Sequence, residues 1–120
     1  MVENRVVVDQ FGPSSWQISL WGEHDLSTVP QLENALDEVF SQGTTIVIDL
    51  SETTFVDSSV IGALIDAQVR ANGNAGEELV VVAPPGSRAA EVIELAGVRP
   101  VLRVYNSRAD AENALASDDS

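Results

Sequence analysis

Residues 55–62, Phe55-Val56-Asp57-Ser58-Ser59-Val60-Ile61-Gly62, join a segment typical of a buried strand to a segment typical of a helix. Residues 44–50 before them are rich in β-branched side chains, as expected of a central strand covered on both faces. Beyond Ser58, apolar residues recur at helical spacing until the Asn- and Gly-rich stretch 72–76. A strand followed by a helix is the repeating unit of an α/β sheet. The stretch therefore predicts an α/β fold.

Asp57 is a favoured helix N-cap residue, so we expect its carboxylate to accept hydrogen bonds from the first backbone N–H groups of the helix. Ser58 and Ser59 then lie in the first turn. A helix start beyond the carboxyl end of a strand is a common binding position in α/β folds, and the helix dipole there favours an anion. A phosphate on Ser58 fits this setting. Asp-Ser-Ser is also an ordinary capping sequence, and the local residues alone favour that simpler interpretation.

The remaining elements complete a single domain. Strands are predicted over 5–11, 16–21, 79–83 and 101–104, and a turn at 12–15 makes the first two a hairpin. A helix is predicted with Val29 and Pro30 in its first turn and Gly43 at its end. Two more are predicted, one capped by Ser87 and closed by Gly97 and one from Ser107 through Leu115. The order is β-β-α-β-α-β-α-β-α, a mostly parallel mixed sheet opened by a β-hairpin. The domain is expected to span 1–116, followed by a flexible acidic tail over 117–120.

The charge balance excludes several function classes. The formal charge is −13, with six Arg and no Lys. This argues against binding a nucleic-acid backbone, which depends on clustered basic residues. It also excludes Schiff-base chemistry and a P-loop lysine. The acidity indicates either a partner with a basic surface or simply a need for solubility.

The composition also bears on compartment. Cysteine is absent, which excludes disulfides, thiol catalysis and thiolate metal sites. The first residues lack the pattern of a signal peptide, and no window approaches the roughly 20 apolar residues of a membrane span. We therefore expect a cytoplasmic protein without membrane insertion.

Trp21 falls on the opposite face of its predicted strand from Trp16, Ile18 and Leu20. An exposed Trp there would mark a contact surface. A Trp packed under a neighbouring helix is commoner, and this is our expectation.

His24 is the only histidine and the natural candidate for catalysis. With Ser58 and a carboxylate from Asp25 or Asp57 it could form a nucleophilic triad, and with Glu23 and Asp25 it could bind a metal. However, a nucleophile elbow needs small glycines beside the serine, whereas Ser58 is bordered by Asp57 and Ser59. We therefore expect a solvated loop histidine, and no metal or cofactor.

The chain resembles a stand-alone STAS domain of the bacterial anti-sigma factor antagonist family over nearly its whole length. Three segments carry the resemblance: Gly22-Glu23-His24-Asp25, then Ile46-Val47-Ile48-Asp49-Leu50 followed by Phe55-Val56-Asp57-Ser58-Ser59, and the closing segment 97–105. The middle segment is the most specific. The resemblance implies a STAS domain over 1–116.

The resemblance also implies a function. In that family an anti-sigma factor with serine kinase activity binds the antagonist, and phosphorylation of the serine after the Asp ends the interaction. That residue would be Ser58, with Asp57 and Ser59 beside it and Glu23, His24 and Asp25 in support; a phosphatase would reset Ser58. The protein would then control sigma-factor-dependent transcription indirectly, without being an enzyme. The alternatives are an unphosphorylated STAS subunit of a transporter or stress-signalling complex and, third, a small serine hydrolase.

Val60 departs from the family pattern, which commonly has glycine after the two hydroxyl residues. A β-branched side chain in the first turn is expected to add bulk beside Ser58 and to alter kinase access or partner choice. Gly62 is retained. We expect Val60→Gly to cost about 1 kcal/mol or less.

Overall fold

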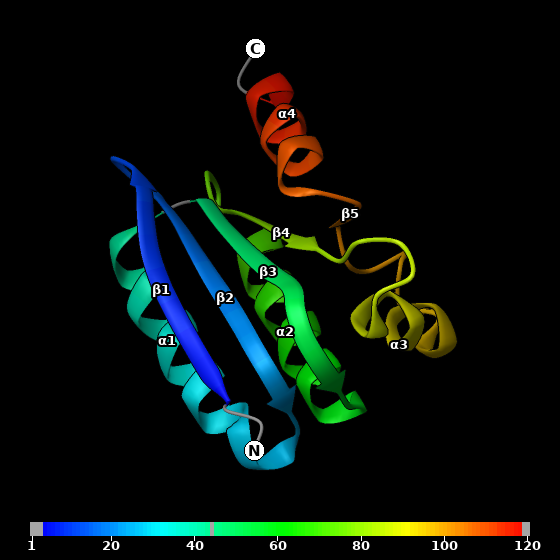
Figure 1. Cartoon of the computed structure of the whole chain (residues 1–120). Coiled ribbons are helices and arrows are strands. Elements are labelled where there is room, and N and C mark those ends of the chain that lie inside the picture. The colour runs from blue at the N-terminus through cyan, green and yellow to red at the C-terminus, as the bar shows by residue number, and fades with distance from the viewer. Residues whose placement is uncertain (1–3, 44, 119–120) are drawn as a thin grey trace.

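The computed structural model describes residues 4–43 and 45–118. They form a five-stranded sheet in the order β1-β2-β3-β4-β5, in which β1 and β2 are antiparallel and the later neighbours are parallel (Figure 1). The predicted α/β class and its opening hairpin are confirmed. The elements are β1 (Arg5–Gly12), β2 (Ser15–His24), the 3-10 turn η1 (Leu26–Thr28), α1 (Val29–Gln42), β3 (Thr45–Val56), α2 (Ser58–Asn72), β4 (Glu78–Val82), α3 (Arg88–Ala96), β5 (Val104–Tyr105) and α4 (Arg108–Asp118).

The helices cover the two faces of the sheet unequally. α1, α2 and α3 pack on one face, where Leu36, Leu64 and Ile93 join the main hydrophobic core. α4 packs on the other face, where Ala111 lies in a smaller cluster with Val80. Within the described residues, no helix packs along the corresponding face of β1 and β2, where the contact with α4 is the Arg108 guanidinium, 4.6 Å from the ring centroid of Phe11 in β1.

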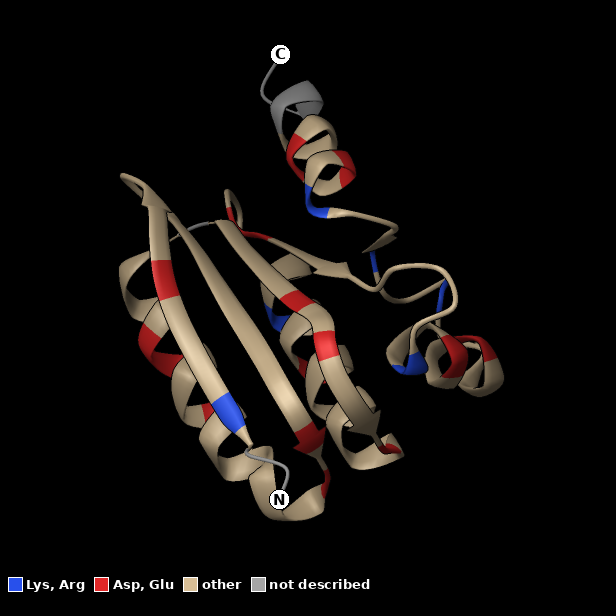
Figure 2. Ribbon diagram, in the orientation of Figure 1, with Lys and Arg blue, Asp and Glu red and all other residues tan. Residues whose placement is uncertain are grey.

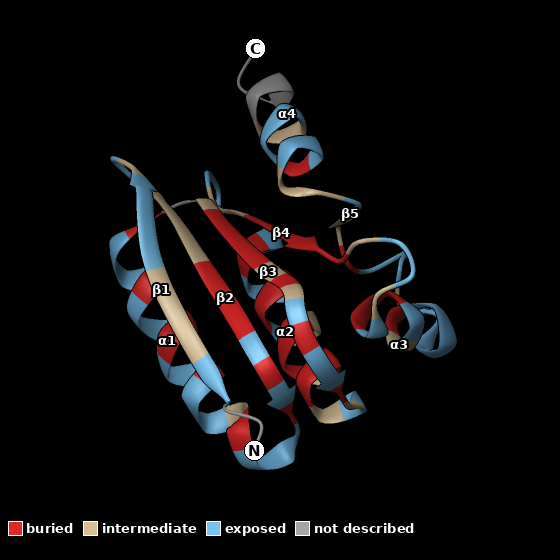
Figure 3. Cartoon of the chain, in the orientation of Figure 1, coloured by how far each residue is buried: buried red, intermediate tan, exposed pale blue. Residues whose placement is uncertain are grey.

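The first half of β3 and most of β4 are buried on both faces, which explains the nearly continuous apolar sequence of these segments. Ile46 and Ile48 belong to the core under α1–α3, whereas Val47 belongs to the cluster under α4, and all three are fully buried. Figure 3 shows buried residues in the middle of β2, in the first half of β3 and along most of β4, and greater exposure along β1. The expectation of a central strand covered on both faces is confirmed.

The helices begin and end at the predicted signals. Pro30 lies in the first turn of α1, where its missing N–H is not needed. The Ser87 hydroxyl caps α3 by accepting a hydrogen bond from the N–H of Ala90 at 3.1 Å. Gly97 follows α3 with a φ of 67°, a left-handed conformation that favours glycine.

β3 extends to Val56, past the predicted end of the strand at Leu50, and its pairing with β2 shifts register twice. The N–H and hydroxyl of Ser51 donate to Asp49 Oδ1 at 2.9 and 2.5 Å, and the Thr53 hydroxyl donates to the Leu50 carbonyl at 2.8 Å. These bonds satisfy the polar side chains inside an irregular strand. The polar sequence over 51–54 therefore bends the strand without ending it.

Two boundaries near the C-terminus also differ from the prediction. β5 is Val104–Tyr105 rather than 101–104, because the N–H groups of Val101 and Leu102 turn back to the Val98 carbonyl at 2.9 and 3.0 Å. α4 follows Ser107 as expected but continues to Asp118. Of the predicted flexible tail, 119–120 lie outside the described residues.

The expectation that Trp21 packs under a helix is wrong. Trp21 is 36% exposed on the open face of β2, and the Arg5 guanidinium lies 5.1 Å from its ring centroid. The physical reason is that α1, α2 and α3 all cover the other face of the sheet, where Ile18 and Leu20 are buried.

Among the described residues, no helix combines the length and the apolar character needed to cross a membrane.

Candidate functional site

The pairing of β2 with β3 brings the two predicted site segments together. Glu23 lies opposite Phe55 and His24 lies opposite Val56 in the parallel register. The N–H of Asp57 donates to the His24 carbonyl at 3.3 Å. The carboxyl end of β2 and the residue before α2 are therefore neighbours. The prediction of a shared site requires this arrangement.

Asp57 caps α2. Its Oδ1 accepts hydrogen bonds from the N–H groups of Ser59 and Val60 at 2.9 and 3.3 Å. Ser58, the first residue of α2, is exposed, and its hydroxyl makes no hydrogen bond within the described part of the chain. Ser59 is half-buried. Of the two hydroxyls, that of Ser58 is the more accessible to another molecule.

Asp25 organises the neighbouring loop. Its carboxylate accepts hydrogen bonds from the Ser27 N–H at 2.9 Å and the Ser27 hydroxyl at 2.5 Å. Both bonds lower the pKa of Asp25 below its ordinary value of 3.8, and the bond from the Ser27 hydroxyl has the larger effect. The backbone N–H of Asp25 donates in turn to the Thr28 hydroxyl at 3.1 Å. Asp25 is thus an exposed carboxylate held in its ionised form.

His24 is not the solvated loop histidine that the sequence led us to expect, because only 1% of it is exposed. Nε2 lies 3.0 Å from the Trp21 carbonyl oxygen, which can only accept, so Nε2 carries a proton. Nδ1 lies 3.1 Å from the Thr28 hydroxyl. Both ring nitrogens are therefore used inside the fold, and neither is hydrogen-bonded to Ser58. The triad is not assembled.

The structure also corrects the expectation for Val60. Its side chain is 1% exposed and joins the core with Ile61 and Leu64, so it does not stand beside Ser58 at the surface. Gly62 follows Ser58 by one turn on the same face of α2. A Cβ at Gly62 would meet no atom within 4 Å. The helix surface beside Ser58 is therefore open.

Two exposed apolar side chains flank the site and were not among the predicted site residues. Leu26, in η1, is 69% exposed, and Phe55, near the end of β3, is 42% exposed. Large apolar side chains on a protein surface are favourable contact points for a partner. An apolar residue inside an otherwise polar loop is the sequence signal that could have identified Leu26.

The surroundings of Ser58 are acidic. Glu23 and Asp25 are exposed, and Asp57 is half-buried. Figure 2 shows acidic residues at the end of β2 and immediately before α2. Among the described residues, no group of three His, Asp or Glu side chains could hold a metal ion. Glu23, Asp25 and Asp57 together make the surface around Ser58 negatively charged.

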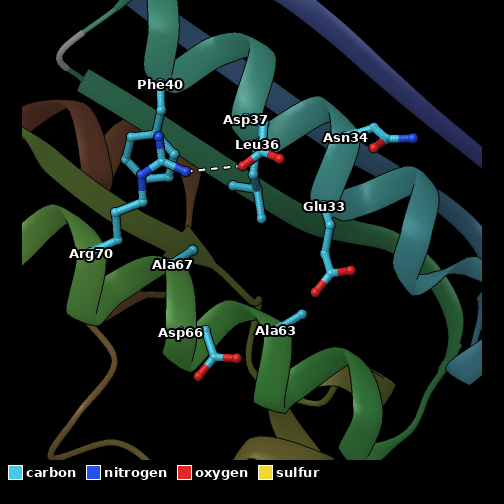
Figure 4. A pocket seen from close by; sticks show the side chains of 9 residues that line it. All are labelled: Glu33, Asn34, Leu36, Asp37, Phe40, Ala63, Asp66, Ala67 and Arg70. Carbon is cyan, nitrogen blue, oxygen red and sulfur yellow. Dashed lines mark hydrogen bonds and ion pairs between the residues drawn. The ribbon is translucent and has the colours of Figure 1, made fainter.

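A groove of about 380 Å³ lies between α1 and α2. In Figure 4, Arg70 reaches across it to Asp37, with a 2.9 Å ion pair, and its guanidinium stacks 4.2 Å from the centre of the Phe40 ring. Glu33 and Asp66 line the same groove and make no ion pair within the described residues. The groove therefore keeps an acidic character next to the exposed face of α2.

The architecture is similar to that of solved anti-sigma factor antagonists. The antagonist SpoIIAA in its unphosphorylated form has 20% sequence identity and a TM-score of 0.74, with 94% of this chain and 97% of that chain covered. An antagonist from Mycobacterium paratuberculosis has 22% identity and a TM-score of 0.72, with 93% of each chain covered. The Bacillus cell fate determinant SpoIIAA in its phosphorylated form has 18% identity and a TM-score of 0.67, with 92% and 99% covered. At these identities the likeness shows the fold.

Sequence comparison supplies the family. No curated protein matches the chain. The model of the family described as "Mlab, STAS domain" matches residues 7–104. This range includes the carboxyl ends of β2 and β3 and the start of α2. Since this match spans most of the sequence, the chain belongs to the STAS domain family.

Proposed function

We propose that this protein is an anti-sigma factor antagonist that binds an anti-sigma factor while Ser58 is unmodified and releases it when Ser58 is phosphorylated. The observation that carries the proposal is the exposed Ser58 hydroxyl at the start of a capped helix, in a region that also carries the exposed side chains of Leu26 and Phe55 and several carboxylates. The partner is an anti-sigma factor that is also a serine kinase, and a phosphatase resets Ser58. The protein then acts in the cytoplasm as a substrate of the kinase rather than as an enzyme.

The position of Ser58 allows a phosphate to act on binding without unfolding the domain. At the first residue of α2, an added anion meets the positive end of the helix dipole. Towards a partner, the same group adds about 1.5 to 2 negative charges next to Glu23, Asp25 and Asp57. A partner surface shaped for a neutral hydroxyl would have to desolvate that charge. Phosphorylation therefore weakens the complex and leaves the fold intact.

The acidic groove indicates the chemistry of the partner. Ala63, next to Gly62, lines the groove together with Glu33 and Asp66, so the groove adjoins the helix face that carries Ser58. A basic segment of the anti-sigma factor fits this surface, because complementary charge speeds encounter and fixes orientation. With a formal charge of −13, the protein acts on transcription through that partner and not by binding DNA.

Two of the similar structures are of SpoIIAA in an unphosphorylated and a phosphorylated form, so this fold accommodates both states of that protein. This supports the proposal that phosphorylation here acts at a surface and not by refolding.

The experiment is incubation with a serine-kinase anti-sigma factor from the same cell and ATP, followed by cleavage after Glu. The peptide 53–77 contains both candidate serines and should gain about 80 Da. Fragmentation should place the phosphate on Ser58, Ser58→Ala should abolish the gain, and the matched control Ser59→Ala should retain it. Modification that persists in Ser58→Ala and is lost in Ser59→Ala would refute the assignment.

Binding of the partner without modification of either serine would instead assign the chain to the unphosphorylated regulatory STAS subunits. The hydrolase alternative receives no support from the geometry, because both ring nitrogens of His24 are bonded to Trp21 and Thr28 and not to Ser58.

A further inference from the structure

We propose that the outer edge of β1 is a self-association surface on which a second copy of this chain adds its own β1 in antiparallel orientation. The surface consists of residues 5–9, Arg5-Val6-Val7-Val8-Asp9. Pairing across it would join two five-stranded sheets into one continuous sheet related by a two-fold axis. This surface is distinct from Ser58 and from the groove between α1 and α2.

β1 is the long edge of the sheet. It pairs with β2 on one side, and among the described residues no strand pairs with its other side. The opposite edge of the sheet, β5, has only two residues. Natural sheets commonly protect an edge with a proline, a bulge or an inward-pointing charge. Over 5–9 β1 contains no proline, and its register with β2 is continuous from Arg5 to Gln10, the irregularity lying beyond.

A groove runs beside this edge. It measures about 530 Å³ and is lined by residues 4–8 together with Gln31, Asn34, Ala35 and Glu38 of α1. Val6 and Val8 lie in it, half-buried against the main core through their pairing with Leu20 and Ile18. A second strand placed along β1 would bring two more valines into this space and extend the hydrophobic core.

The charges of β1 are self-complementary. Arg5, Val7 and Asp9 lie on the open face of the sheet, opposite Trp21, Ser19 and Gln17 of β2. Figure 2 shows one basic and one acidic band along β1. In an antiparallel pair centred on Val7, Arg5 of each copy lies opposite Asp9 of the other, and Val6 lies opposite Val8. Opposite-charge pairs directly across two strands are favourable.

The same residues specify the register. A shift of the centre to residue 5 would place Arg5 against Arg5, and a shift to residue 9 would place Asp9 against Asp9, both of which are repulsive. Centres at residues 6 and 8 leave the charges without opposite partners. Pairing centred on Val7 is therefore the register that matches both charges and the valines. This self-complementarity identifies the occupant of the groove as a second copy rather than an unrelated strand.

The formal charge of −13 on each copy opposes association at long range. Salt screens such repulsion over about 8 Å at physiological ionic strength, whereas the Arg5 and Asp9 pairs act at contact distance. The association is therefore expected to be reversible and concentration-dependent, and it should be measured near 0.15 M salt.

Charge exchange tests the proposal on the full chain by sedimentation equilibrium. The wild type should show a monomer–dimer equilibrium, and Arg5→Asp or Asp9→Arg should each lower the association constant at least tenfold, because each single change creates like-charge contacts at both symmetric positions. An equimolar mixture of the two single variants should associate, since all its cross-pairs are opposite in sign. The double variant Arg5→Asp/Asp9→Arg should also associate. Arg88→Asp, at an exposed position of α3, is the charge-matched control for Arg5→Asp and should associate like the wild type.

A second measurement fixes the register. The sequence has no cysteine, and directly opposite residues in an antiparallel pair have Cα atoms about 4.5–5.5 Å apart, within disulfide range. Oxidised Val7→Cys should therefore form a covalent dimer, whereas Val101→Cys, 50% exposed in the segment after α3, should not. Ser58→Asp should leave self-association unchanged, which separates this surface from the proposed switch.

Several results would overturn the proposal: a wild type that stays monomeric up to millimolar concentration, single charge variants that associate like the wild type, or a mixture that associates no better than its components. Circular dichroism of every variant checks folding. If a charge variant does not fold, the Val7→Cys and Val101→Cys comparison decides, and equal cross-linking of the two refutes the register.

Discussion

Replacing Val60 by glycine should destabilise the domain by about 3 kcal/mol, well above the 1 kcal/mol expected from its place near a helix end. The Val60 side chain is 1% exposed and lies in the main core. Burying a valine side chain contributes roughly 1.5–3 kcal/mol, and a cavity adds to its loss because the surroundings relax only partly. The poorer helix propensity of glycine adds a few tenths of a kcal/mol.

Val69 provides a matched control, because it is also a valine in α2 but is 63% exposed. Val69→Gly removes the same atoms from the same helix and should cost less than about 1 kcal/mol. Urea unfolding, followed by circular dichroism, measures both. With a slope of about 1–3 kcal/mol per molar urea, Val60→Gly should lower the midpoint by about 1–3 M. Equal losses for the two variants would refute the packing argument.

The functional half of this prediction concerns kinase access. Because Val60 points into the core and not toward the Ser58 hydroxyl, Val60→Gly should leave the rate of Ser58 phosphorylation unchanged per folded molecule. The rate should be measured far from the unfolding midpoint, where about 95% or more of the protein is folded. A clear rise in that rate would show that the Val60 side chain restricts the kinase.

Four further predictions follow from the site. Ser58→Ala should keep partner binding and resist release by the kinase. Ser58→Asp should weaken binding up to a hundredfold, about 3 kcal/mol, with an unchanged circular dichroism spectrum. Equal affinities of Ser58→Asp and the wild type in a binding titration would contradict this. Gly62→Ala should raise stability by up to about 1 kcal/mol in urea unfolding, because its Cβ meets no neighbour, yet weaken a partner that approaches the helix closely. Asp66→Arg should slow association with a basic partner and reduce its salt dependence in stopped-flow measurements, and an unchanged rate would remove the groove from the interface. The Asp25 carboxylate should show a pKa below 3.8 in an NMR titration. Its contribution to stability is then present above pH 3.8 and is lost as the pH falls through the lowered pKa. A pKa at or above 3.8 would show that the hydrogen bonds from Ser27 do not persist in solution.

The cap of α2 could be predicted from the sequence because it depends only on neighbours along the chain. Asp57 accepts hydrogen bonds from residues two and three positions later, and such bonds follow from residue type and spacing. The residues on the buried face of α2 could also be predicted from the sequence. Val60 precedes Leu64 by one helical turn, and Leu64 precedes Gln68 by another, so helical periodicity places Val60 on the core side. The bulk expected beside Ser58 is therefore at odds with the helical pattern itself.

The environments of Trp21 and His24 could not be predicted in the same way. The exposure of Trp21 depends on which face of the sheet three distant helices cover. The burial of His24 depends on an irregular β3 that runs six residues past its expected end and carries the chain alongside the end of β2. Polar residues over 51–54 resemble a loop in sequence, whereas in the structure they pair with β2 and are supported by local hydrogen bonds. Both errors therefore come from tertiary structure and not from residue preference.

In the proposed switch, the two faces of α2 separate stability from regulation. Val60, Leu64 and Gln68 face the interior, and Ser58 and Asp66 face outward on the other side of the same helix. Asp57 accepts hydrogen bonds from the N–H groups of Ser59 and Val60 while Ser58 is unmodified, so the helix does not need a phosphate to form. An anion added at the N-terminus of this helix is expected to be tolerated. A charge added at Ser58 therefore changes the free energy of the complex with a partner much more than the free energy of unfolding. Such a separation lets a reversible modification control binding in a small domain that has little stability to lose.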